Sequence, residues 1–144
     1  MDSKEFKNIF DGIAKTNGFS KAFGGWYKES GECIAILELQ KSNFADSFYL
    51  NIKIFIQGAF GRTYTPSKDL VKSSMGHITH QIRDTDILDF DTSMDDVKRK
   101  ERVENLFSEF IVPFTNKALS RSGIRELADK GEVFLLPAVK AELE

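Results

Sequence analysis

The stretch CIAILELQ at residues 33–40, followed by SFYLNIKIFIQ at residues 47–57, decides the fold of this chain. Apolar side chains recur at every second position in both stretches, as they do in a strand that buries one face. The side chains that share this apolar face are Cys33, Ala35, Leu37, Leu39, Phe48, Leu50, Ile52, Ile54 and Ile56. Because only Lys41–Asp46 separates the stretches, they are close enough to form a hairpin. We therefore predict two neighbouring antiparallel strands with one buried face.

Two weaker β segments lie on either side of this hairpin. Trp26–Glu29 precedes it, and the turn signal Ser30-Gly31 joins the two. Residues 77–83 resume a weak alternation after the long polar stretch Gly58–Gly76. We interpret Phe19–Gly25, which is rich in Gly and aromatic residues, as a loop. The pattern therefore predicts a meander of about four strands.

Helices are expected at both ends of the chain. Residues 2–16 carry an amphipathic pattern, with Asp2 and Glu5 at capping-box spacing. Helices that precede and follow a meander are typical of an α+β fold in which the helices pack on one face of the sheet. No repeat or linker interrupts the chain, so we expect residues 1–144 to form a single domain.

The C-terminal part predicts a long helix that contains a proline. It starts at Ser93 and keeps helical spacing of apolar residues to Phe114. Pro113 is expected to kink or break it, because proline lacks the backbone donor and crowds the preceding turn. A shorter helix covers residues 124–130, and Val133–Leu136 forms either a small edge strand or an extended tail.

Composition and charge exclude several classes of partner. The chain has 144 residues, of which 41% are hydrophobic, and 20 basic residues stand against 22 acidic ones, for a net charge of -2. Such a chain has no global attraction for nucleic acid or anionic lipid. The short basic run Lys98–Arg102 is interrupted by Glu101, and pairing along a solvated helix face explains it. We therefore expect no nucleic-acid partner.

Cysteine content and hydropathy point to a reducing, aqueous compartment. Cys33 is the only cysteine, which excludes an intramolecular disulfide and a cysteine-based zinc cluster. No apolar run approaches the length needed to span a bilayer, and the first residues do not read as a signal or transit peptide. We therefore predict a cytoplasmic protein without membrane contact.

No motif in the chain predicts a catalytic residue, a metal or a cofactor. His77 and His80 are the only histidines, and on a strand an offset of three places them on opposite faces. The acidic segment 84–96 lacks the glycine and the closing glutamate of a calcium loop. Gly58–Arg62 lacks the residues of a phosphate-binding loop, and Cys33 lies on the apolar face, where we expect it to be buried.

The second face of the central hairpin mixes polar and apolar side chains. It carries Glu38, Gln40, Tyr49, Asn51, Lys53 and Gln57, with Ile34, Ile36 and Phe55 among them. Amides, an aromatic hydroxyl and apolar patches together are typical of a ligand or partner surface. The alternatives are an ordinary open sheet face, or a face covered by the loop Gly58–Gly76.

An ordered set of short motifs resembles a known bacterial domain family. The motifs are Asn17-Gly18-Phe19, Trp26-Tyr27, Leu39-Gln40-Lys41-Ser42 and Phe48-Tyr49-Leu50-Asn51, followed by His80 and Arg83. Over residues 4–115 the chain is similar to DUF4304, a bacterial domain of unknown function. The resemblance implies a bacterial, cytoplasmic domain and brings no assigned catalytic residue.

These observations favour a non-enzymatic module that binds a protein partner, of an accessory or immunity type. The candidate binding residues are Gln40, Lys41, Ser42, Tyr49, Asn51, Lys53, His80 and Arg83. The alternative is a small enzyme or small-molecule binder with a pocket near His80, Arg83 and Asn51. A structural role also stays open for Gln40 and Asn51, which would then satisfy backbone groups of an adjacent loop.

Overall fold

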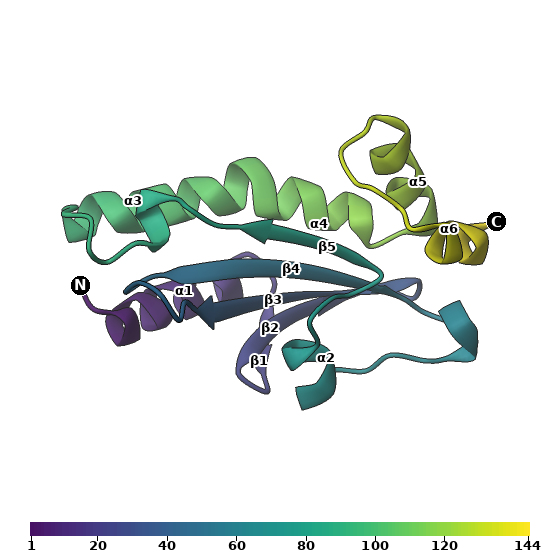
Figure 1. Ribbon diagram of the computed structural model, residues 1–144, viewed down its shortest axis with the longest axis horizontal. Coiled ribbons are helices and arrows are strands. Elements are labelled where there is room, and N and C mark those ends of the chain that lie inside the picture. Colours follow the sequence, from purple (N-terminus) through teal and green to yellow (C-terminus); the bar gives the residue numbers. More distant parts are fainter.

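A computed structural model describes residues 1–144 and shows an α+β fold with a five-stranded antiparallel sheet (Figure 1). The strands follow chain order across the sheet: β1 (Ser20–Ala22), β2 (Gly25–Glu29), β3 (Cys33–Lys41), β4 (Phe48–Ile56) and β5 (Ile78–Ile82). The helices are α1 (Ser3–Thr16), α2 (Lys68–Lys72), α3 (Asp96–Leu106), α4 (Val112–Ala118), α5 (Arg121–Asp129) and α6 (Pro137–Leu143). The predicted fold class and meander are confirmed.

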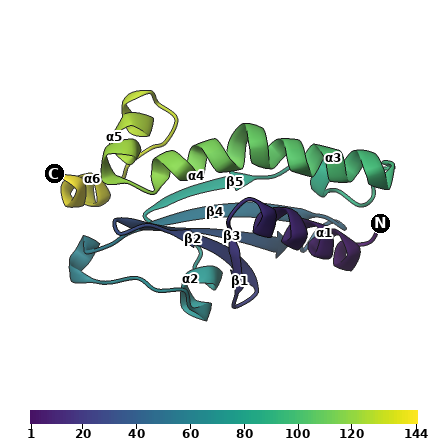
Figure 2. The same cartoon turned by 180° about the vertical axis from the view of Figure 1, so that it is seen from behind.

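The central hairpin packs as its alternation predicts. Residues Cys33 to Lys41 of β3 pair with Ile56 to Phe48 of β4, so the apolar side chains of both strands share one face. Leu50 and Ile52 are fully buried there. Helices α1, α3 and α4 cover this inner face, as the two opposite views in Figures 1 and 2 show. We call the opposite side of the sheet the outer face.

The strand that the sequence prediction missed is β1. It lies in the segment Phe19–Gly25, which we interpreted as a loop, and it pairs with β2 through a tight turn at Phe23 and Gly24. Both turn residues have positive φ, 54° and 79°. Turns of this kind usually carry Asn or Gly at the first of these positions, so the phenylalanine hides the signal.

Helix α1 forms where the capping pattern predicts. The carboxylate of Asp2 accepts a hydrogen bond from the backbone N–H of Glu5 at 2.8 Å, which satisfies one of the free donors of the first turn. Phe6 and Phe10 are buried on one side of the helix and contact Phe48 and Trp26 of the sheet. This aromatic contact fixes α1 on the inner face.

The long C-terminal helix differs from its prediction in two ways. It begins at Asp96, capped by the Asp95 carboxylate, rather than at Ser93. Pro113 neither breaks nor sharply bends it, because the preceding turn Phe107–Ile111 is π-helical and the Val112 N–H donates to the Phe107 carbonyl. Pro113 follows this turn directly, within a helix that runs without interruption from Asp96 to Ala118.

Arg99 corrects the interpretation of the basic run as a solvated helix face. It is only 3% exposed, and its guanidinium donates to the backbone carbonyls of Ile87 at 2.6 Å and Thr92 at 3.0 Å. It therefore stabilises the acidic connector between β5 and α3.

The sequence left two alternatives for Val133–Leu136, a small edge strand or an extended tail. The structure shows an extended tail, which leads into α6.

Candidate functional site

Residues 59–76 cover one end of the outer face and leave the other end uncovered. One end, which we call the covered end, lies under residues 59–76 and includes Ile34, Ile36 and Phe55. The other, the open end, carries Gln40, Tyr49, Asn51 and Gln81 together with the hairpin loop 41–48. The sequence left open whether the loop Gly58–Gly76 covers this face, and the structure shows that it covers one end only.

The covered end is a second, smaller apolar core. Tyr64 stacks on Phe55 with ring centroids 5.4 Å apart, and Val71 of α2 is buried beside them. The amide of Gln57 clamps the covering segment, since it donates to the Tyr64 carbonyl at 2.6 Å and accepts from the Tyr64 N–H at 2.7 Å. Gln57 therefore holds the covering segment on the sheet, with both the nitrogen and the oxygen of its amide in use.

His77 is part of the same cover. Its Nδ1 accepts a hydrogen bond from the Ile56 backbone N–H at 2.9 Å, so the proton of the neutral ring lies on Nε2 and donates to the Tyr64 hydroxyl at 3.1 Å. The hydroxyl in turn donates to the Ala59 carbonyl at 3.0 Å. Burial is the main cause that lowers the pKa of His77 from its usual 6.5. These contacts give His77 a structural role.

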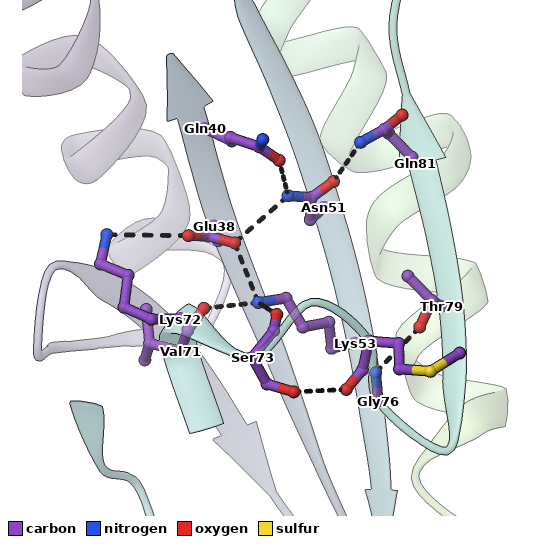
Figure 3. A network of polar contacts seen from close by, with 11 residues as sticks. Glu38, Gln40, Asn51, Lys53, Val71, Lys72, Ser73, Gly76, Thr79 and Gln81 are labelled. Atoms are coloured by element: carbon purple, nitrogen blue, oxygen red, sulfur yellow. Dashed lines mark hydrogen bonds and ion pairs between the residues drawn. The ribbon is translucent and has the colours of Figure 1, made fainter. Parts of the chain in front are cut away.

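A buried ion pair marks the boundary between the two ends (Figure 3). The Lys53 ammonium is 1% exposed and donates to Glu38 Oε1 at 2.9 Å and to the carbonyls of Val71 and Ser73 at 2.5 and 2.6 Å. All three donors of the ammonium are used. Lys53 was predicted to contact a ligand or partner, and the structure instead places it inside the protein, where it ties α2 to the sheet.

A row of amide side chains crosses the open end (Figure 3). Asn51 of β4 donates to Gln40 of β3 at 2.8 Å, and Gln81 of β5 donates to Asn51 at 2.8 Å. Asn51 also donates to Glu38 at 3.2 Å, so the row is fixed to the buried ion pair. Gln40 and Gln81 are exposed and keep hydrogen-bonding groups that face solvent. This row is a hydrogen-bonded polar surface that spans three strands.

The amide row borders a shallow polar hollow of about 320 Å³. Its lining residues are Glu38, Gln40, Asn51, Lys72, Ser73, Ser74, Thr79 and Gln81. The Lys72 ammonium lies 3.6 Å from Glu38 Oε2, so it reaches over the hollow from α2. Every lining side chain is polar, and the hollow can therefore accept a hydrogen-bonding group from outside.

The β3–β4 hairpin loop extends the open end and projects one aromatic side chain. Ser42 is buried, and its hydroxyl accepts hydrogen bonds from the backbone N–H groups of Phe44 at 3.1 Å and Ala45 at 3.3 Å. Phe44 itself is 94% exposed. The sequence analysis missed Phe44, although a phenylalanine inside the polar loop 42–47 was a visible signal. Ser42 therefore holds the backbone of the loop from which the Phe44 side chain projects into solvent.

Tyr49, Lys41 and Arg83 complete the open end. The Tyr49 hydroxyl lies 3.4 Å from that of Ser42, and the Arg83 guanidinium lies over the Tyr49 ring at 5.0 Å. Lys41 and Arg83 are exposed at their charged ends and pair with the loop residues Asp46 and Asp84. The two cations are therefore locally balanced, and the open end has little net charge.

His80 lies apart from the other predicted site residues. It pairs with Ile52 across the strands and shares the inner face with it, whereas Asn51 and Gln81 point to the outer face. Its ring packs against Phe110 and Phe114 of the long helix at 4.9 and 5.7 Å. A pocket that combines His80 with Arg83 and Asn51, which the alternative hypothesis required, is therefore not assembled.

One further group bears on chemistry, the thiol of Cys33. Cys33 is fully buried, and burial raises the pKa of its thiol to about 11, which is the behaviour of a structural cysteine. The structure contains no cluster of three or more His, Cys, Asp or Glu side chains arranged around a metal position. None of the helices has both the length and the apolar character that crossing a bilayer requires.

Comparison with known proteins gives one match. The family model of DUF4304, described as a domain of unknown function, matches residues 10–117, which is more than half of the chain. This protein therefore belongs to the DUF4304 family, as the ordered motifs indicated. No curated protein and no solved structure matches it. The matched region contains all five strands and therefore the whole open end.

Proposed function

We propose that this protein is a non-enzymatic binding module, bacterial and cytoplasmic, of an accessory or immunity type, which recognises a protein partner through the open end of the outer face. The observation that carries the proposal is the hydrogen-bonded amide row Gln40, Asn51 and Gln81 beside the exposed aromatic side chain of Phe44, whose loop is held by the Ser42 hydroxyl.

The amide row supports this proposal through its rigidity. Asn51 is held by three hydrogen bonds and is 7% exposed, so its neighbours Gln40 and Gln81 are oriented before a partner arrives. A surface that is already ordered loses little conformational entropy on binding. Amides present donors and acceptors together, which complements the polar rim that protein interfaces usually have.

Phe44 supplies a large apolar side chain, which the amide row does not have. Interfaces derive much of their affinity from a few large side chains that become fully desolvated, and aromatic residues are enriched among them. An isolated, fully wet phenylalanine makes no contribution to the fold of the free protein. Because Ser42 fixes the loop that carries Phe44, this side chain is suited to act as the anchor that enters an apolar pocket of the partner.

A small-molecule binder is the second candidate, and the polar hollow is the observation in its favour. Its volume of about 320 Å³ is at the lower end of the range for ligand sites. Ligand pockets are, however, lined mostly by apolar and aromatic side chains, and none of the residues around this hollow is apolar. The hollow therefore fits a hydrogen-bonding side chain of a docked protein better than an enclosed small molecule.

The test is partner capture followed by a binding measurement with purified components. The full chain is immobilised and exposed to a lysate of its own organism, and each captured protein is purified and its dissociation constant measured. We expect Phe44→Ala to weaken the complex by about 2 kcal/mol, the usual threshold for an interface anchor. Gln81→Ala is expected to weaken it by about 1 kcal/mol.

Phe134→Ala is the matched control, because Phe134 is also a highly exposed phenylalanine, at 79%, but lies far along the chain in the C-terminal tail. It should leave the dissociation constant unchanged. A partner whose affinity falls with Phe134→Ala and not with Phe44→Ala would overturn the proposal. So would turnover of a substrate that is lost in Asn51→Ala while folding is intact.

A further inference from the structure

A second pocket lies on the opposite side of strand β5, away from the outer face. Its volume is about 440 Å³, and it opens between β5, helix α4 and the end of α5. The lining residues are His80, Glu109, Phe110, Pro113, Phe114, Lys117, Leu127 and Glu132. Apart from His80, none of these residues was a candidate for a functional site in the sequence, and the function proposed above does not use the pocket.

Aromatic rings form one wall of this pocket. Phe110 and Phe114 are stacked with ring centroids 5.3 Å apart and nearly parallel planes, and His80 packs on both. The π-helical turn Phe107–Ile111 supplies Phe110 and the neighbouring Glu109. Turns of this type occur often at functional sites, since they change the direction in which a helix presents its side chains.

The charged side chains around the rings are predominantly acidic and unpaired. Glu109 and Glu132 are exposed and take part in none of the ion pairs of the structure. Lys117 is the one cation in the lining, and its ammonium is held by Glu126 at 2.8 Å. The pocket therefore presents two free carboxylates beside an aromatic wall.

The imidazole ring of His80 offers the pocket an uncharged hydrogen-bond acceptor. Neither of its ring nitrogens has a hydrogen-bond partner within the protein, and burial lowers the pKa of the ring from 6.5. At neutral pH the ring is therefore uncharged and offers a nitrogen acceptor. An acceptor, two carboxylates and aromatic faces together match a flat cation with several donors, and they match an anion poorly.

We propose that this pocket binds the guanidinium group of an arginine side chain, presented by an extended segment of a partner protein that pairs with the free edge of β5. Guanidinium is planar and stacks on aromatic rings while it donates hydrogen bonds to carboxylates at its rim. This site is separate from the open end, and the proposal does not depend on the function that we propose for the open end.

The free backbone groups at the edge of β5 are the reason to expect that the partner segment is extended. The Ile56 N–H points toward β5, where His77 accepts it, and alternate residues of β4 share that direction. Ile78, His80 and Ile82 therefore bond to β4, and Thr79 and Gln81 turn their backbone N–H and C=O groups away from it. Neither residue makes a backbone hydrogen bond elsewhere in the chain. A strand added at this edge would place a side chain beside His80.

Titration of the full chain with Nα-acetyl-L-arginine N-methylamide, followed by NMR, tests the pocket. We expect saturable shifts of the His80 ring signals and of the amides of Phe110 and Phe114, with Asn51 unaffected. Glu109→Gln should weaken binding about fivefold, as loss of an exposed ion pair does. Glu101→Gln, an exposed carboxylate on α3 outside the pocket, is the matched control and should bind as the wild type does.

Two results would overturn the assignment of the pocket. One is equal binding of the neutral analogue Nα-acetyl-L-citrulline N-methylamide, which has the same shape without the charge. The other is the absence of shifts at His80 when the arginine probe is raised to its solubility limit. Neither experiment involves Phe44 or the amide row, so failure here is distinguishable from failure of the proposed function.

The source of the guanidinium is tested with the peptide acetyl-Thr-Val-Arg-Val-Thr-amide. If the peptide adds a strand to β5, its two valines pair with Thr79 and Gln81 and can form four new backbone hydrogen bonds, which should make it bind at least about tenfold more tightly than the single blocked residue. The amides of Thr79 and Gln81 should then exchange more slowly. Equal affinity for the peptide, for its version N-methylated at both valines and for free L-arginine would contradict a strand partner.

Discussion

The two ends of the outer face have the same alternation of side chains along β3 and β4, but the outward side chains are buried at one end and partly exposed at the other. At the covered end, Phe55 of β4 lies under Tyr64 and is almost fully buried, whereas at the open end Tyr49 of the same strand is only half-buried. The strands do not differ in geometry between these positions, since one continuous register joins β3 and β4. The covering segment 59–76 therefore decides which side chains become core and which stay available.

The polar groups at the two ends show the same contrast. The Lys53 ammonium at the boundary has three protein acceptors and no free donor. Gln40 of β3 and Gln81 of β5 both bond to Asn51, which lies two residues from Lys53 along β4, and they keep free groups that face solvent. A saturated buried group stabilises the fold, and an ordered but unsaturated group is suited to recognition. The comparison therefore links stability to the covered end and supports the binding role that we propose for the open end.

The largest effect is expected from Glu38→Ala. This change leaves the Lys53 ammonium buried without its carboxylate, and breaking a buried pair from one side should lower the free energy of unfolding by about 3 kcal/mol. Urea denaturation measures it. Glu29→Ala, an exposed carboxylate at the end of β2 without an ion pair, is the control and should have little effect. A loss below about 1 kcal/mol in Glu38→Ala would show that the pair is not a buried one.

Asn51→Ala should have the next largest effect. It removes the central amide of the row, so Gln40 and Gln81 lose their shared partner, and the free energy of unfolding should fall by about 1–2 kcal/mol. The same variant should bind the partner less tightly, because the row is no longer ordered. An unchanged affinity, measured for the folded variant by calorimetry, would separate the amide row from recognition.

A smaller effect is expected from pH at the covered end. Since burial lowers the pKa of His77 from 6.5, the unfolded chain takes up the proton at a higher pH than the folded chain does. The free energy of unfolding should therefore be highest above pH 6.5 and should fall as the pH is lowered toward the folded-state pKa. Comparison at about pH 7.5 and about pH 5.5 spans this window.

His77→Gln tests whether this histidine contributes to the pH dependence. The pKa of His80 is lowered too, so His77→Gln should reduce the decrease in stability and leave a part of it. An identical decrease in the variant and in the wild type would contradict the role assigned to His77 in holding the cover.

The smallest effect on stability is expected from Phe44→Ala. Its side chain touches solvent on almost every side, so the free energy of unfolding should change by less than about 0.5 kcal/mol. Thermal denaturation checks this, with Phe48→Ala as the contrast, since Phe48 lies four residues further along the chain and is buried against Phe6. A Phe44 variant that unfolds as easily as the Phe48 variant would show that the hairpin tip is part of the core.

Much of the fold was predictable from the sequence, because local rules and tertiary packing agree there. The alternation in residues 33–57 specified both the central hairpin and its buried face, and Asp2 marked the start of α1. The errors fall where tertiary contacts override local signals. Phe23 takes a turn conformation that a phenylalanine rarely adopts, and Pro113 follows a π-helical turn that no local pattern announces.

The binding face was less predictable, because alternation assigns a side chain to a face but does not say what covers that face. Gln40, Asn51 and Tyr49 were placed together correctly on one side of the sheet. Lys53 shares that side and is buried, since α2 forms above it from five residues of a segment that carried no clear helical pattern. His80 was grouped with Asn51, but the register between β4 and β5 aligns His80 with Ile52, so the two side chains lie on opposite faces of the sheet.

Hydrogen–deuterium exchange of the full chain, alone and in complex with its captured partner, tests the division of the outer face most directly. The account predicts slower exchange at residues 40–51 and 79–83 in the complex, with residues 59–76 unchanged. Protection that is confined to residues 59–76, or to helices α1 and α3, would contradict it.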